Sequence, residues 1–458
     1  MGGVSYNEFL RRKIIRQQPS GFRVENINNK LFDWQKRLVE WSLFRGRAAL
    51  FEGCGLGKTA QQIEWAYHVN KKTNLPVLIL APLAVSKQTV REGEKFGIDV
   101  NLCRNQDDVK NCINITNYER LHLFYPDEFP GVVLDEGGII KNFAGKIRNQ
   151  IIDMFLRTPY KMCATATPAP NDFPELGNTS EFLGVMTRPE MLSMFFINDT
   201  AHTGTWRLKG HVKDNKYWEW LASWSVMIQK PSDIGYPDNG FILPELKTYN
   251  HIIPYQGQKT TLFTEEAKTL QERRKARQES IEARVELIAD MINNSNDTWI
   301  AWCGLNAESE MLSKKIKDSV EIRGSNTPEH KENAMIDFQD NKIKCLVTKP
   351  SIAGHGMNWQ NCSNMAFVGL SDSFEEYYQA VRRCWRFGQT RSVNVHIVIE
   401  EREGSVFQNV MRKETQMQNM LDGMAGHMKM LMERELKQST SNLTVYEPKK
   451  EMILPSWL

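Results

Sequence analysis

The strongest constraint on this chain is a glycine-rich turn at residues 52–59, with the sequence EGCGLGKT. The apolar run AALF precedes it at residues 48–51, which is typical of a buried strand, and apolar residues recur at helical spacing after the turn. A strand, a glycine turn and a helix in this order are the context of a phosphate-binding loop. Gly55 and Gly57 allow backbone N–H groups to point at phosphate oxygens, and the helix N-terminus adds a partial positive charge.

In this interpretation the side chains at the end of the turn bind the nucleotide and its metal ion. Lys58 would reach the β- and γ-phosphates, and the Thr59 hydroxyl would hold Mg²⁺. Leu56 lies between the two glycines and belongs to the same loop. Glu52 occupies the first position, where the usual pattern has glycine. The alternative is a glycine turn that carries a surface lysine.

Strands and helices alternate after this turn. Strand-like runs at 77–81, 113–118, 131–136 and 161–165 predict a parallel sheet with helices on both faces. Ligands on such sheets bind at the carboxyl ends of strands, where the loop and the pair Asp135-Glu136 both lie. Asp135 would hold Mg²⁺ with Thr59, and Glu136 would polarise the attacking water. The alternative is an acidic pair that merely caps the next segment.

A second α/β unit follows at about residues 295–400, and it has no phosphate loop. One sheet with the loop and one without it predict a nucleotide bound between two lobes. A helix expected over 375–386 carries Arg383 and Arg386, which are three residues apart and therefore share one face. Their guanidinium groups would neutralise charge on the transferred phosphoryl group. The alternative is a basic face that pairs with nearby acids.

The alternation lapses between these units. Tyr217, Trp220 and Trp224 have the spacing of a packed helix face, with base stacking as the alternative. The mixed charges at 268–286 predict a solvated helix or a brace between the lobes. The class is therefore α/β: two tandem parallel-sheet lobes with a mostly helical insertion. We expect an N-terminal extension at 1–30, a first lobe at 31–176, the insertion and linker at 177–294, a second lobe at 295–400 and a helical tail at 401–458.

Composition limits the partners, the redox environment and the location that we expect for the protein. The net charge is +3, so contact with nucleic acid must come from a local basic stripe. Eight cysteines without a C-x-x-C pair favour reduced thiols, with neither a zinc site nor a disulfide framework. We expect no export signal, no membrane span and a cytoplasmic monomer. The methionines between 411 and 432 predict a seam that packs back on a lobe, with a partner-binding face as the alternative.

Taken together, these segments resemble the Swi/Snf-type DNA-dependent ATPases of helicase superfamily two, over about residues 31–400. The sixth motif is the most specific, because QAVRRCWRFGQ at 379–389 has every fixed position of Q-A-x-x-R-x-x-R-x-G-Q. The other matching segments are GLGKT at 55–59, DEGGIIKN at 135–142, TATPAPN at 165–171, LP at 243–244 and GHGMN at 354–358.

The resemblance implies two RecA-like lobes that close on ATP and Mg²⁺ and move along duplex DNA without necessarily separating its strands. It implies that Gln35 reads adenine and that Gly356 and Asn358 complete the nucleotide site. Thr165 and Thr167 would couple the nucleotide state to the DNA track. The track residues that it implies are Pro82, Lys87, Thr116, Lys349 and Ser351, with Thr165 and Thr167 beside them.

Two departures and two alternatives accompany the resemblance. Gly138 stands where the family usually has a histidine that couples hydrolysis to DNA movement, and VMI at 226–228 stands where an arginine pair is common. The compact chain is typical of a bacterial or viral motor, in a bacterial cell or a phage-infected host. One alternative is an RNA or single-strand helicase, whose sixth motif normally reads H-R-x-G-R. The other is a nucleotide-switched DNA-binding scaffold with little hydrolysis.

Overall fold

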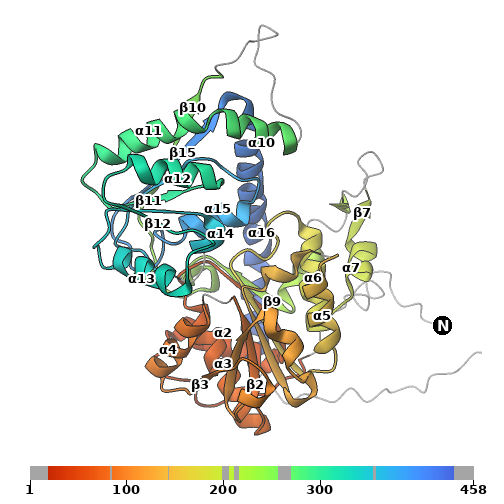
Figure 1. Cartoon of the computed structure of the whole chain (residues 1–458). Helices are drawn as coiled ribbons and strands as arrows, with labels where there is room; N and C mark the ends of the chain where they lie inside the picture. Colours follow the sequence, from red (N-terminus) through yellow and green to blue (C-terminus); the bar gives the residue numbers. More distant parts are fainter. Residues whose placement is uncertain are drawn as a thin grey trace, which may run out of the picture.

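The computed structural model describes residues 19–437, apart from 83–84, 143, 199–205, 211–215, 256–269 and 354–356. Two α/β lobes follow one another along the chain, and a long C-terminal helix connects them (Figure 1). Each lobe is built on its own parallel sheet. The expected architecture of two tandem parallel-sheet lobes is therefore confirmed.

The first sheet has seven parallel strands in the order β3-β4-β2-β5-β6-β1-β9. Its strands are β1 (Arg47–Glu52), β2 (Val77–Ala81), β3 (Val100–Leu102), β4 (Ile113–Asn117), β5 (Gly131–Asp135), β6 (Tyr160–Thr165) and β9 (Ser225–Ile228). Its α-helices are α2 (Asp33–Arg45), α3 (Lys58–Thr73), α4 (Ser86–Phe96), α5 (Lys146–Met154), α6 (Leu176–Leu183), α7 (Arg188–Phe195) and α9 (Lys216–Ala222).

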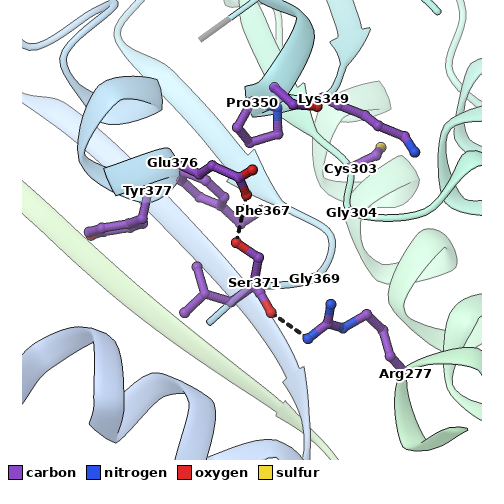
Figure 2. Close-up of a pocket in the computed structure, with 12 residues that line it drawn as sticks. Arg277, Cys303, Gly304, Lys349, Pro350, Phe367, Gly369, Ser371, Glu376 and Tyr377 are labelled. Atoms are coloured by element: carbon purple, nitrogen blue, oxygen red, sulfur yellow. Dashed lines mark hydrogen bonds between the residues drawn. The ribbon is translucent and has the colours of Figure 1, made fainter. Parts of the chain in front are cut away.

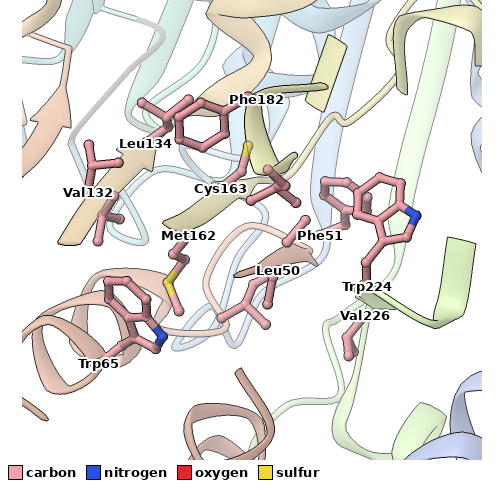
Figure 3. Packing of buried hydrophobic residues seen from close by; sticks show 14 of the residues in the cluster. Leu50, Phe51, Trp65, Val132, Leu134, Met162, Cys163, Phe182, Trp224 and Val226 are labelled. Carbon is pink, nitrogen blue, oxygen red and sulfur yellow. The ribbon is translucent and has the colours of Figure 1, made fainter. Parts of the chain in front are cut away.

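The central strands of this sheet are short continuous apolar runs because helices cover both of their faces. Figure 3 shows Leu50 and Phe51 of β1 among Met162, Trp65 and Trp224, all of which are buried. This packing fixes the carboxyl ends of β1 and β5 on the same side of the sheet, and the phosphate loop and the acidic pair follow these ends.

The second sheet has six parallel strands in the order β10-β15-β14-β11-β13-β12. Its strands are β10 (Leu246–Ile253), β11 (Trp299–Trp302), β12 (Ser319–Glu321), β13 (Cys345–Thr348), β14 (Asn364–Phe367) and β15 (Val393–Glu400). Its helices are α10 (Leu270–Glu279), α11 (Ile281–Asn293), α12 (Asn306–Lys315), α13 (Pro328–Gln339), α14 (Pro350–Ala353) and α15 (Phe374–Val381).

The range 177–294 contributes to both lobes in the structure and does not form an inserted unit. Strand β9 is the edge of the first sheet, and β10 is the edge of the second. Buried residues of α11 belong to a core that includes β11 and β13. The short strands β7 (Phe196–Asn198) and β8 (Trp206–Leu208) pair antiparallel. The aromatic rings at 217, 220 and 224 lie in the core of the first lobe, so they form a packed seam and offer no face to a base.

Helix α16 (Gly404–Lys437) spans both lobes (Figure 1). Val406 and Val410 belong to the core of the second lobe. Met420, Met424 and Met428 belong to the core of the first. The predicted methionine seam is confirmed, and it packs on a lobe other than the one from which the helix starts.

Within the described residues, no helix is long and apolar enough to cross a membrane. All eight cysteines fall in the described part of the chain, and none of them forms a disulfide.

Candidate active site

The phosphate loop connects β1 to α3 with the backbone that its glycines allow. Gly55 and Gly57 have φ of +91° and +79°, a region that residues with a Cβ rarely adopt. Lys58 is the first residue of α3, and its Nζ donates to the carbonyl oxygens of Glu52 at 2.9 Å and Gly53 at 3.4 Å. These hydrogen bonds hold the ammonium group against the start of the loop, close to the helix N-terminus where a phosphate would bind.

Glu52 is a buried carboxyl group under this loop. Gln61 Nε2 donates to its Oε2 at 2.8 Å, and its Oε1 has no hydrogen-bond partner among the described residues. Burial raises the pKa of Glu52 to about 7, against the opposing effects of Lys58 and Gln61. Burial by itself would lower the pKa of Lys58, but Cys54, Glu136 and Glu52 act in the opposite direction and raise it.

Asp135 and Glu136 leave the end of β5 beside the loop. Gln62 Nε2 donates to Asp135 Oδ1 at 2.7 Å. Burial, followed by the charge of Glu136, raises the pKa of Asp135 to about 6. Glu136 has a left-handed backbone, with φ of 52°, which turns the chain into the 3₁₀ helix η4 (Gly137–Lys141). A cation at this point would stabilise both carboxylates in their charged forms.

These residues fit a Mg²⁺ ion held mainly by a nucleotide. Mg²⁺ commonly keeps several waters and takes one or two protein oxygens together with substrate phosphates. Asp135 and the Thr59 hydroxyl can supply such oxygens from β5 and α3. No group of three or more histidine, cysteine or acidic side chains suited to a metal occurs among the described residues.

Gln35 lies against the phosphate loop, and its amide is engaged at both ends. Its Nε2 donates to the carbonyl oxygen of Leu56 at 2.8 Å, and its Oε1 accepts from the backbone N–H of Phe32 at 3.0 Å. The side chain is 5% exposed. In this arrangement Gln35 supports the loop, and reading adenine would use the remaining hydrogen-bonding capacity of the amide.

The second lobe supplies the opposite wall. A Cβ placed on Gly55 would lie 3.0 Å from the backbone nitrogen of Phe387 and 3.3 Å from the Cβ of Arg386, so the sixth motif touches the phosphate loop. Gln379 Nε2 lies 3.4 Å from Glu136 Oε2. Arg383 donates to Gln379 Oε1 at 3.0 Å and to the carbonyl oxygen of Met357 at 3.1 Å.

The predicted helix over 375–386 is shorter in the structure. Helix α15 ends at Val381, and the chain continues in tighter turns up to Gly388, which has φ of +91°. Tertiary contacts explain the early end, because Trp385 Nε1 donates to the carbonyl oxygen of Pro244 at 2.7 Å and Phe387 stacks on Phe241. The sequence predicts that the two arginines share one helix face. In the structure they lie after the end of α15, so this prediction is wrong.

Both arginines are nevertheless turned inward. Arg383 is 5% exposed, and Arg386 Nε is buried without a hydrogen-bond partner among the described residues. Burial, followed by the charge of Arg383, lowers the pKa of Arg386 to about 10. Two cationic groups and Lys58 around one loop create a site suited to a multiply charged anion.

Only Met357 and Asn358 of the fifth motif are described in the structure, and Met357 contacts Arg383. Gly356 lies outside the described residues. Asn358 is half-buried, and its Oδ1 has no hydrogen-bond partner in the described part of the chain. Its neighbour Met357 accepts the bond from Arg383 noted above.

The residues expected along a DNA track divide into two groups. Thr116, Thr165 and Thr167 are each about 1% exposed, so their hydroxyl groups do not face a surface. Thr116 and Thr165 belong to β4 and β6, whose sheet is covered by helices on both faces, and this accounts for their burial. Thr167 lies two residues after the end of β6. Pro82 is partly exposed, and Lys87 is exposed and pairs with Glu332 of the second lobe at 3.0 Å.

Lys349 and Ser351 line a cavity of about 160 Å³ in the second lobe (Figure 2). Arg277 donates to the carbonyl oxygen of Leu370 at 2.6 Å at its edge. Beneath it lies a fully buried ion pair in which Arg284 Nη1 donates to Glu308 Oε1 at 2.7 Å. Glu308 Oε2 also accepts from the backbone of Gly304, which lines the same cavity.

Sequence reasoning missed several residues that the structure brings to the site. Gln61 and Gln62 bind the two buried acids, and their signal is weak because they occupy ordinary helix positions after the loop. Lys141 of the first lobe and Glu375 of the second form an ion pair. No local sequence pattern predicts this pair.

Comparisons with known proteins match both lobes of the chain. A profile of the SNF2-related domain matches residues 34–195, and a profile of the helicase conserved C-terminal domain matches residues 279–388. The chromatin structure-remodeling complex subunit snf21 of Schizosaccharomyces pombe is 26% identical over 188 residues, which cover 36% of this chain and 15% of that protein. The SWI/SNF-related matrix-associated actin-dependent regulator of chromatin subfamily A-like protein 1 of Xenopus tropicalis is 21% identical over 438 residues, which cover 86% and 45%.

Two solved structures align with most of this chain. Saccharomyces cerevisiae Dbp5 bound to RNA and ADP BeF3 has a TM-score of 0.53 and 13% identity, covering 83% of this chain and 87% of that one. The Sulfolobus solfataricus SWI2/SNF2 ATPase core in complex with dsDNA has a TM-score of 0.43 and 18% identity, covering 93% and 100%. This chain spans less than half the length of the two curated relatives named above. With its SNF2-related domain followed by a helicase C-terminal domain, the chain belongs to the Snf2-type ATPases of helicase superfamily two.

Proposed function

We propose that this protein hydrolyses ATP with Mg²⁺ between its two lobes and uses the cycle to move along double-stranded DNA. The observation that carries the proposal is the direct contact between the phosphate loop at Gly55 and the backbone around Arg386. Because this contact places cationic side chains from both lobes around one anion site, a triphosphate would be enclosed on two sides.

Each group then has a chemical task. Lys58 contacts the β- and γ-phosphates, and Asp135 and Thr59 would hold Mg²⁺, which neutralises charge on the phosphate oxygens when bound. Glu136 accepts a hydrogen bond from the attacking water and polarises it. Arg383 and Arg386 stabilise the negative charge of the transition state.

Two observations favour duplex DNA over RNA, and a third concerns contact with any nucleic-acid backbone. The relatives named above are regulators or remodelers of chromatin by their printed names. The sixth motif ends in RFGQ and so lacks the H-R-x-G-R pattern expected of an RNA helicase. Lys87 and the cavity that contains Lys349 and Ser351 offer basic and polar surface to a phosphate backbone.

The test is ATP turnover with Mg²⁺, measured without nucleic acid and with duplex DNA, single-stranded DNA or RNA. We expect duplex DNA to stimulate most, and displacement of a third strand from a triplex to report movement. Greater stimulation by RNA would favour the RNA helicase alternative. No turnover with any of them would favour a nucleotide-switched scaffold.

Glu136→Gln provides the matched variant for this assay, and Glu119→Gln, an exposed carboxylate of the same lobe, is its control. Glu136→Gln should bind a fluorescent ATP analogue as the wild type does but should not turn ATP over, because it loses the carboxylate that polarises water. Wild-type turnover by Glu136→Gln would refute the role given to that residue.

A further inference from the structure

Glu375 lies where a side chain at position 138 would lie. It belongs to the first turn of α15, in the second lobe. A Cβ placed on Gly138 of the first lobe would be 2.9 Å from Glu375 Oε1. The other carboxylate oxygen pairs with Lys141, at the far end of the 3₁₀ helix that carries Gly138. The side chains of Lys141 and Glu375 are 33% and 19% exposed, so water screens this pair only in part.

The position above Gly138 is bounded by Glu375 and by residues of the second and third motifs. The same Cβ would be 3.7 Å from the carbonyl oxygen of Thr167 and 3.8 Å from Thr165 Oγ1. Glu136 lies two residues before Gly138 in the chain. Glu375 therefore reaches from the second lobe into the space between the acidic pair and the two threonines.

Glu375 also shares a helix face with Gln379, which contacts Glu136. Glu375 and Gln379 are four residues apart on α15, so their side chains are neighbours. Gln379 contacts Glu136 at 3.4 Å and accepts from Arg383 at 3.0 Å. The neighbouring side chains of Glu375 and Gln379 thus connect Lys141 to the water-polarising carboxylate and to one of the arginines.

Other contacts hold the chain at Lys141 and close to Glu375. Asn178 donates to the carbonyl oxygen of Lys141 at 2.7 Å. Lys413 of α16 donates to Asn171 of the first lobe at 3.0 Å and to the carbonyl oxygen of Asp372 at 2.9 Å, three residues before Glu375. Because Lys141 and Glu375 belong to different lobes, their ion pair depends on how the two lobes meet.

We propose that Glu375 is a positioning residue that takes over, from the second lobe, the task of the side chain that position 138 lacks. Its ion pair with Lys141 fixes the turn that follows Glu136 and holds Gln379 against that carboxylate. Lobe closure is thereby coupled to water activation. This inference rests on the proposed ATP hydrolysis and identifies how the same site is assembled.

The test compares Glu375→Gln, Lys141→Glu, Glu375→Lys and the charge-swapped double variant Glu375→Lys/Lys141→Glu. The readouts are kcat and KM for ATP at saturating duplex DNA, the affinity for a fluorescent ATP analogue and the melting temperature. Glu332→Gln is the matched control, because it removes a carboxylate that also bridges the lobes, at Lys87, but lies away from Glu136.

We expect Glu375→Gln to lower kcat about tenfold while KM and analogue affinity change less than about twofold. The double variant should recover most of the activity that either charge reversal loses, and Glu332→Gln should retain the wild-type kcat. Equal kcat for Glu375→Gln and the wild type would overturn the inference, as would a double variant no better than the single reversals. A wild type that does not hydrolyse ATP would instead refute the proposed function itself.

Discussion

The buried carboxyl group of Glu52 should make the stability of the first lobe depend on pH. Burial raises its pKa to about 7, whereas an unfolded glutamate titrates near about 4.3. Between these values the folded state holds a proton that the unfolded state has lost. The stabilising contribution is therefore fully present below the unfolded pKa and disappears as the pH rises through about 7.

The two pKa values set the size of this effect. Linkage gives a loss of about 2 kcal/mol between about pH 5.5 and about pH 8. Asp135 titrates in an overlapping range, since its pKa is also raised, to about 6. The quantity to compare is therefore the difference between the wild type and Glu52→Gln, in which Asp135 is common to both.

Urea unfolding without nucleotide, followed by circular dichroism at several pH values, measures that difference. Between about pH 5.5 and about pH 8, the unfolding free energy of Glu52→Gln should rise by about 2 kcal/mol relative to that of the wild type. This change with pH is expected whatever the difference in stability between the two proteins at acidic pH. In Gln61→Met the loss of stability with rising pH should occur at higher pH than in the wild type, because the amide of Gln61 lowers the pKa of Glu52. A difference that stays constant with pH would refute the reasoning, since it would mean that Glu52 titrates alike in both states.

Three further predictions concern single side chains. Arg386→Ala should lower kcat about 10³-fold with little change in ATP affinity, measured by steady-state turnover and analogue binding; an equal loss in both would contradict its role. Gly423→Ala should lower the melting temperature although alanine favours helices by about 1 kcal/mol, because the new Cβ would lie 2.6 Å from the buried ring of Trp218. Arg284→Met should lower the urea stability of the second lobe by about 3–5 kcal/mol, since Glu308 would remain as an unpaired buried carboxylate.

The parts of the fold that could be predicted are those with continuous burial. Strands β1, β2, β5 and β6 are short apolar runs because helices cover both faces of their sheet, and such runs are visible in the sequence. Strand β10 is an edge strand with mostly exposed or half-buried residues, so its sequence LKTYNHII has no apolar pattern that would reveal it. The sequence therefore predicts that the second lobe begins at 295, whereas in the structure β10 already belongs to its sheet and β9 still belongs to the first.

The candidate site shows the same division. The phosphate loop and the acidic pair depend on local backbone geometry, which Gly55, Gly57 and the end of β5 determine within a few residues. The end of α15 depends on contacts made by Trp385 and Phe387 with residues more than 140 positions earlier. Such contacts leave no periodic trace, so a regular helix up to the second arginine was the natural expectation.

The contact between Gly138 and Glu375 joins two observations that the sequence presents separately, a missing side chain and an acid one turn before Gln379. Their connection is steric: with a Cβ on residue 138 only 2.9 Å from the carboxylate, the two positions cannot both carry bulky side chains in this arrangement. We therefore expect relatives with a histidine at the position of Gly138 to lack an acid at the position of Glu375, and relatives with glycine there to retain both the acid and the lysine equivalent to Lys141. An alignment of many relatives would measure this pairing. Frequent joint occurrence of the histidine and the acid would show that the lobes of those proteins meet differently, and that the present contact is not the substitute we infer.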